Sequence, residues 1–197
     1  MNDVLARLRD ADQALDAMHP TPFPLPIAGE EAVIAGAVLG LARGDWWVPG
    51  ARERVGAVLR DVPLDRVVDA FAGAKPYKIA PPTPAPALRA LHAVGIGIAD
   101  PDRAVLVHLG IGSVADGAFA EALNLAALHR PRVLFLVSVL AFGDDAPIGP
   151  QSAATPEALA TAYGIPVTTV PRTDAEAVRA AVVAARDAGG PHVIVAR

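Results

Sequence analysis

The clearest fold signal in this chain is AVLVHLGIGSVADGAFAEALNLAA, residues 104–127. It begins with an apolar run, Ala104–Leu109, that is typical of a strand buried on both faces. Gly110 and Gly112 then predict a turn, and the residues from Ala115 to His129 predict a helix. A strand, a glycine turn and a helix in this order indicate one unit of a parallel sheet with covering helices.

The segments that follow repeat this alternation. Apolar runs predict strands at 132–140, 167–170 and 192–196, and helices are predicted between them at 155–163 and 174–188. Near-continuous apolar strands are expected in a parallel sheet that is covered on both faces. The predicted fold class is therefore α/β, with three layers and a mostly parallel sheet flanked by helices.

The first half of the chain contributes mainly helices. Apolar spacing predicts them at 4–18, 30–41, 52–60, 64–71 and 87–99, with a loop or short extended piece at 45–50. The prolines after residue 18 forbid regular structure. Residues 1–26 are interpreted as an N-terminal helix and a proline-rich connector within a single domain that spans 1–197.

Composition excludes several classes of protein. Hydrophobic residues make up 53% of the 197 residues and charged residues 19%, which indicates a globular chain. A net charge of −4 gives no electrostatic reason to expect nucleic acid or an anionic membrane as a partner. The chain has no cysteine, so disulfides and thiolate metal sites are excluded. No secretory signal or membrane span is indicated, and a cytoplasmic location is expected.

Residues 117–127, GAFAEALNLAA, resemble the cofactor segment of the alpha subunits of thiamine-diphosphate-dependent 2-oxo acid dehydrogenases. That segment reads Gly-Asp-Gly, then an acidic or amide residue, a glycine, a Phe and Glu-Ala-Leu-Asn. Other segments resemble the same family in the same order, and these are Gly29–Ala32, Gly44–Arg52, Leu91–Gly95, Tyr163–Pro166 and Gly190–Pro191. The resemblance covers about residues 25–197 and implies a thiamine-diphosphate-binding-type fold.

The resemblance also implies that the magnesium ligands are missing. In the family, the aspartate of Gly-Asp-Gly and an Asn-Asn pair at the end of the next strand ligate the magnesium that bridges the cofactor phosphates. The corresponding residues here are Ile111 and Val139-Leu140. None of them offers the side-chain oxygen that magnesium requires.

Three further departures point the same way. Ala51 stands where the family has the tyrosine of a Tyr-Arg phosphate contact, and Arg52 remains. The loop at 73–86 contains no histidine, whereas the family carries a functional one there. Relatives also continue beyond the position of Arg197 into a segment with a second histidine, and the resemblance implies that this segment is absent.

The resemblance thus predicts a degenerate cofactor site with no catalytic residue and no metal ligand. Its residues are Arg52, Gly110, Ile111, Gly112, Ser113, Val139 and Leu140. A glycine turn that opens a helix is by itself also a possible anion site.

Several residues near this segment have competing interpretations. Ser113 and Asp116 have the spacing of a capping box, which is preferred to a substitute metal ligand. His108 is expected to be a strand-end residue whose ring is satisfied there, with a place in a pocket as the alternative. Asp144-Asp145 is expected to be a solvated turn, with weak cation binding as the alternative.

A set of interface residues is also predicted, and it comprises Trp46, Trp47, Phe119, Glu121 and Asn124. The alternative for the two tryptophans is a core pair. The alternative for Glu121 and Asn124 is an interaction within their own helix.

Three functions follow from these residues. The first is a non-catalytic or cofactor-poor homologue of the alpha subunit that acts as a structural or regulatory subunit. No cofactor is expected for it. It would work in a homo-oligomer or in a heteromer with a beta-type subunit. The second is an active subunit that uses thiamine diphosphate with magnesium and works with a beta-type partner. The third is a module that binds a small anionic ligand at the glycine turn.

Overall fold

The computed structural model describes residues 1–18, 26–68, 75–81, 83, 85–140 and 152–197. The proline-rich connector at 19–25, the end of the helix predicted at 64–71, and the predicted Asp144-Asp145 turn lie outside these residues. No helix in the described ranges is both long and apolar enough to span a membrane.

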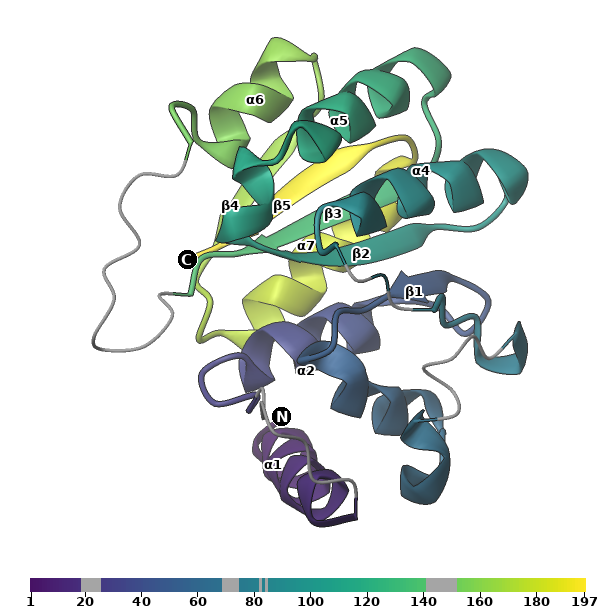
Figure 1. The fold of residues 1–197 in the computed structure, drawn as a ribbon, viewed down its shortest axis with the longest axis vertical. Helices are drawn as coiled ribbons and strands as arrows, with labels where there is room; N and C mark the ends of the chain where they lie inside the picture. Colours follow the sequence, from purple (N-terminus) through teal and green to yellow (C-terminus); the bar gives the residue numbers. More distant parts are fainter. Residues whose placement is uncertain (19–25, 69–74, 82, 84, 141–151) are drawn as a thin grey trace.

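A parallel sheet of five strands forms the centre of the molecule (Figure 1), with the strand order β1-β2-β3-β5-β4. Every neighbouring pair is parallel. The strands are β1 (Trp46–Val48), β2 (Val105–Gly110), β3 (Val133–Ser138), β4 (Val167–Val170) and β5 (His192–Ala196). The predicted α/β class with a parallel sheet is therefore confirmed.

Helices cover both faces of the sheet and make the three layers (Figure 1). One face carries α4 (Leu88–Ala99), α5 (Gly117–His129) and α6 (Pro156–Ala162), and the other carries α2 (Glu31–Gly40) and α7 (Ala175–Ala188). Helix α1 (Asn2–Met18) packs outside α2, against the 3₁₀ segment Glu53–Arg60.

Alternation along the strands divides the core into two clusters, one on each face. In β2, Leu106 joins the cluster beneath α2 and α7, whereas Val105 and Val107 join the cluster beneath α4 and α5. Successive strand residues point to opposite faces, and here both faces are covered. This is why strands of a parallel sheet are apolar throughout and can be found from sequence.

The structure differs from the sequence prediction in the connecting segments. The helix predicted at 52–60 is the 3₁₀ segment Glu53–Arg60. The helix predicted at 64–71 begins with the 3₁₀ turn Leu64–Arg66, and residues 67–68, the last of it that the structure describes, are α-helical. The loop predicted at 73–86 contains the 3₁₀ turn Lys75–Tyr77. The predicted glycine turn is the 3₁₀ segment Ile111–Ala115. Over one or two turns the apolar spacing of a 3₁₀ segment is close to that of an α-helix, so the sequence pattern does not separate the two.

The predicted capping box is wrong, because α5 starts later than it requires. Asp116 is itself the N-cap residue, and its Oδ1 accepts a hydrogen bond of 2.9 Å from the backbone N–H of Ala118. Ser113 lies in the preceding 3₁₀ segment. Asp116 therefore caps α5, as was expected in preference to binding a metal. It does so as the N-cap residue itself, and not as the acidic partner of an N-cap at Ser113.

Candidate functional site

A cavity of about 440 Å³ lies where β2 and β3 end. In open parallel sheets, ligands bind outside the carboxyl ends of the strands. The cavity is lined by Glu30, Ala51, Arg52, Glu53, Pro86, Ala87, Arg89, His108, Leu109, Gly110, Ile111, Gly112, Ser113, Asp116, Ser138 and Leu140. Its size is within the range of about 300–1,000 Å³ that is usual for small-molecule sites.

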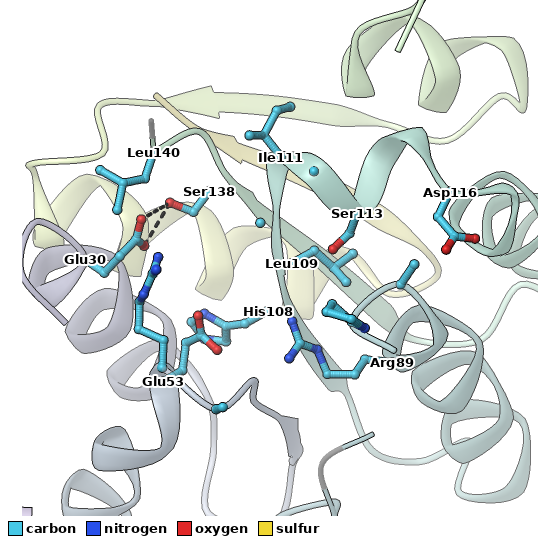
Figure 2. Close-up of a pocket in the computed structure, with 16 residues that line it drawn as sticks. Glu30, Glu53, Arg89, His108, Leu109, Ile111, Ser113, Asp116, Ser138 and Leu140 are labelled. Carbon is cyan, nitrogen blue, oxygen red and sulfur yellow. Dashed lines mark hydrogen bonds between the residues drawn. The ribbon is translucent and has the colours of Figure 1, made fainter. Parts of the chain in front are cut away.

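At one end of the cavity, a buried carboxyl group from α2 meets the end of β3. Glu30 is only 2% exposed, and the Ser138 hydroxyl lies 2.6 and 2.8 Å from its two carboxyl oxygens (Figure 2). Burial raises the pKa of Glu30, while the Ser138 hydrogen bond opposes that effect. Glu30 precedes the first residue of α2 but makes no side-chain cap, so its carboxyl group is directed to the site.

At the other end, the cavity contains a buried guanidinium group from α4. Arg89 is 8% exposed, and burial lowers its pKa while the charge of Glu53 raises it. Glu53 accepts a hydrogen bond of 2.7 Å from the backbone N–H of Gly50. A side chain at Gly50 would collide with Arg89 Nη1 and Glu53 Oε2. The missing side chain at Gly50 therefore leaves room for both charged groups.

His108 lies at the floor of the cavity between these two ends (Figure 2). Its ring packs edge-on against Trp47, with ring centroids 5.9 Å apart. Burial lowers the pKa of His108 to about 4, so the imidazole is neutral at physiological pH. Its Nε2 has no hydrogen-bond partner among the described residues. His108 thus lines the cavity, as the alternative interpretation of this residue has it.

The ends of the two strands do not suit a magnesium-diphosphate group. Ile111 and Leu140 line the cavity at these ends (Figure 2), and neither side chain can ligate a hard cation. No group of three or more potential metal-ligating residues occurs in the described parts of the chain. The nearby carboxylate of Asp116 is occupied by capping α5. The donor set that is present therefore does not fit the cofactor that the resemblance implies.

The structure brings together six of the seven residues predicted for the degenerate cofactor site. Arg52, Gly110, Ile111, Gly112, Ser113 and Leu140 all line the cavity. Val139 does not line it, since its side chain packs against the core cluster beneath α4 and α5, and its backbone N–H bonds to Ala196. Whether these residues bind a cofactor remains a prediction.

The interface assignment is wrong for two residues, because their side chains are completely buried within this chain. Trp47 and Phe119 are each 0% exposed. Trp47 points to the opposite face of β1 from Trp46, as strand alternation requires, and Phe119 packs edge-on against Phe135 in the core. For Trp47, the core alternative is correct.

The other three predicted interface residues are at least partly exposed. Trp46 donates a hydrogen bond of 2.8 Å to Asp100, and the Lys78 ammonium lies 4.6 Å from its ring centroid. Asn124 donates to Glu121 at 3.2 Å, within α5. The interaction within the helix is therefore confirmed, and a role in an interface stays a prediction.

Sequence reasoning missed the charged residues that give the cavity its character, Glu30, Glu53 and Arg89. One signal was available for Arg89, since it is a single charge in the otherwise apolar and small-residue helix LRALHAVGIGIA. Glu30 had no such signal. An acid at a helix start is explained equally well by the helix dipole.

The strand order and the three layers define an α/β protein of the thiamine-diphosphate-binding fold. A transketolase from Campylobacter jejuni superposes with a TM-score of 0.72 over 98% of this chain and 36% of its own, at 16% identity. A thiamin diphosphate-dependent enzyme from Mycobacterium smegmatis superposes with a TM-score of 0.59 over 84% of this chain and 31% of its own, at 20% identity. At these identities the similarity concerns the fold alone.

Sequence comparison places the chain in a particular family. The family described as Dehydrogenase E1 component matches residues 82–192. The alpha subunit of 3-methyl-2-oxobutanoate dehydrogenase from Mycobacterium tuberculosis is 32% identical over 87% of this chain and 51% of its own length. The pyruvate dehydrogenase E1 component alpha subunit of Mycoplasma genitalium is 30% identical over 86% of this chain and 52% of its own. The chain therefore belongs to the dehydrogenase E1 component family, and it spans about half the length of these relatives.

Proposed function

We propose that this chain is a cofactor-poor member of its family that acts as a structural or regulatory subunit and catalyses no decarboxylation of its own. The observation that carries the proposal is the apolar pair Ile111 and Leu140 at the ends of β2 and β3. Magnesium needs oxygen ligands in near-octahedral geometry, and the cofactor diphosphate needs that magnesium to offset its charge. Hydrocarbon side chains at both positions oppose both requirements.

The charges around the cavity support the same conclusion. Glu30 and Glu53 place two carboxyl groups in the lining, against the two guanidinium groups of Arg52 and Arg89. The cavity therefore has no excess of positive charge to hold a diphosphate without a metal. Charged oxygens buried without compensating partners cost several kcal/mol.

The proposed role as a subunit is supported by the family and by the surface of the molecule. Its curated relatives are named as alpha subunits. Large apolar side chains are exposed on α4 and α5, among them Ile98 at 48% and Leu128 at 69%. We infer a homo-oligomer or a heteromer with a beta-type subunit, in the cytoplasm.

Calorimetric titration with thiamine diphosphate and magnesium tests the loss of the cofactor site. The chain is titrated in the assembly in which it is isolated, and we expect no binding with a Kd below about 1 mM, or about −4 kcal/mol. The double substitution Ile111→Asp and Leu140→Asn returns oxygen ligands to both strand ends, and it is expected to give measurable magnesium-dependent binding.

A matched control places the same polar groups away from the cavity and from α4 and α5, with Met18→Asp on α1 and Leu39→Asn on α2, both exposed positions. This control is expected to leave cofactor binding as weak as in the wild type. Micromolar, magnesium-dependent binding by the wild-type chain would contradict the proposal and favour the active alternative.

A further inference from the structure

The most buried charged groups of the cavity lie at its two ends. Glu30, 2% exposed, forms the acidic end with Ser138, and Arg89, 8% exposed, forms the basic end, with the half-buried Glu53 beside it (Figure 2). The Ser113 hydroxyl also lines the cavity, and in Figure 2 its oxygen points into the space beside Leu109. Such an arrangement favours a ligand with a positive donor group at one end and a negative acceptor group at the other.

Hydrogen-bonding capacity remains unused in the lining. Among the described residues, Arg89 Nε and His108 Nε2 have no hydrogen-bond partner, although the two residues are 8% and 3% exposed. Buried polar groups in native proteins are normally satisfied. At the other end, burial raises the pKa of Glu30 even though the Ser138 hydroxyl and the charges of Arg52 and Arg172 act against it.

The buried and half-buried charges of the lining balance one another. Glu30 and Glu53 supply two carboxyl groups, and Arg52 and Arg89 supply two guanidinium groups, while the carboxylate of Asp116 is exposed and caps α5. A ligand with a net charge would upset this balance in a partly desolvated site, where electrostatic interactions are stronger than in water. A ligand that carries one positive and one negative group leaves the balance unchanged.

The remaining wall of the cavity is aliphatic. Leu109, Ile111 and Leu140 line it together with Pro86 and Ala87. Burial of a hydrocarbon side chain of the ligand against these groups is favourable, at roughly 25 cal/mol per Å² of apolar surface. The polar groups then orient the ligand, and the aliphatic wall selects its side chain.

The geometry points to an aliphatic amino acid, bound as its zwitterion, as the ligand of this cavity, with its ammonium group on Glu30 and its carboxylate on Arg89 and Ser113. The inference rests on the proposed function only in requiring that thiamine diphosphate does not fill the cavity. Such a ligand would make the chain a sensor subunit, because its binding joins the start of α2, the 3₁₀ segment after β2 and α4 through a single molecule.

Three compounds that share the same branched four-carbon unit test this inference on the wild-type protein. L-valine carries both charged groups, 3-methylbutanoate lacks the amine and isobutylamine lacks the carboxylate. In calorimetric titrations valine is expected to bind at least about tenfold more tightly than either fragment, as expected for the loss of one charge-assisted hydrogen bond. Equal binding of valine and either fragment, or no binding of valine at about 10 mM, where millimolar sites are saturated, overturns the inference.

Two substitutions assign the ends of the ligand. Glu30→Gln keeps the shape of the side chain and is expected to reduce the preference for valine over 3-methylbutanoate at least about tenfold. Arg89→Gln is expected to reduce the preference for valine over isobutylamine to a similar degree. These ratios compare two ligands on one protein, so a uniform loss of folded protein does not change them.

The matched controls make the same two changes in an exposed ion pair of α7, as Glu176→Gln and Arg179→Gln. Neither is expected to alter the preference between ligands. The inference is wrong if Glu30→Gln and Arg89→Gln keep the wild-type preferences. Thiamine diphosphate binding would remove the proposed function as well, whereas failure of valine alone removes only this inference.

Discussion

At the scale of single residues, His108 shows how burial can dominate the protonation state of a side chain. Its ring is enclosed beside Trp47 and Arg89, and desolvation is the largest influence on its pKa, followed by the opposing charges of Glu53 and Arg89. The folded pKa is lowered from 6.5 to about 4. Folding therefore favours the neutral imidazole, and the chain loses stability when His108 must be protonated.

The acid sensitivity of folding tests this reading of His108. A lowered histidine pKa contributes stability that is present above pH 6.5 and lost as the pH falls toward 4. The drop in pKa corresponds to about 3 kcal/mol. His108→Phe keeps a neutral ring against Trp47 and is expected to lose less stability than the wild type between these pH values, as measured by urea unfolding.

The raised pKa of Glu30 acts in the opposite sense, because its contribution to stability is lost as the pH rises through the folded pKa. Glu30 is present in both proteins, so its effect cancels in the comparison. The control is His129→Phe at the exposed end of α5. Parallel stability curves for the wild type and His108→Phe would show that His108 is not the group that titrates.

The two neighbouring tryptophans are expected to respond differently to truncation. Trp47 is fully buried in the core cluster with α2, and Trp47→Ala is expected to lower the free energy of unfolding by about 3–5 kcal/mol. Trp46 is partly exposed, and Trp46→Ala is expected to cost less because water replaces part of its contacts. Chemical denaturation of both variants checks the order, and equal losses would contradict the assignment of only Trp47 to the core.

At the scale of elements, the close crossing of α2 and α7 holds one face of the sheet together. Glycines on α2 allow this approach. A Cβ at Gly36 would lie 2.5 Å from the carbonyl oxygen of Ala175 and 2.7 Å from Cβ of Val178, and a Cβ at Gly40 would lie 2.7 Å from Cβ of Val182. Since Glu30 directly precedes α2, this crossing also positions the acidic end of the cavity.

A pair of glycine-to-alanine substitutions tests the crossing. Gly36→Ala is expected to destabilise the chain by about 1–3 kcal/mol, since backbone of α7 must move to admit the methyl group. Gly95→Ala on α4 is the control, because nothing lies within 4 Å of its Cβ position. That change is expected to stabilise by up to about 1 kcal/mol through helix propensity. Thermal unfolding of both variants gives the comparison, and a harmless Gly36→Ala would contradict the close packing.

At the scale of the whole molecule, one parallel sheet and its two helical layers account for about half the length of the curated relatives. The described surface carries large exposed apolar side chains on α4 and α5, including Leu88 at 40%, Ile98 at 48% and Leu128 at 69%. Single exposed apolar residues are common, but several on adjacent helices are consistent with the subunit role proposed here.

Oligomeric state is the corresponding prediction. Sedimentation velocity of the purified chain is expected to show an oligomer, and Leu128→Glu is expected to shift it toward the monomer because a carboxylate at a buried contact is costly. Met18→Glu is the control, at a 44% exposed apolar position on α1, away from α5 (Figure 1). A monomeric wild-type chain would exclude the homo-oligomer, and equal effects of the two substitutions would exclude an interface centred on α5.

The sequence by itself determined the class of the fold and most of its elements. The strands at 167–170 and 192–196 were predicted with their observed limits, because apolar and β-branched runs bounded by turns are local signals. The 3₁₀ segments were not distinguished from helices or turns, because a repeat of 3.0 and one of 3.6 residues give nearly the same pattern over one or two turns. The glycine segment after β2 was also found from sequence, and it does lie at the cavity.

Only the tertiary structure decided which side chains share that cavity. Glu30 and Ser138 are 108 residues apart in sequence and in contact in the fold, and Arg89 reaches the same space from the helix on the other face of the sheet. Trp47 and Phe119 lie in the core because elements distant in the sequence pack over them. A local pattern encodes the conformation of its own segment, whereas burial and partnership depend on which distant elements pack against it.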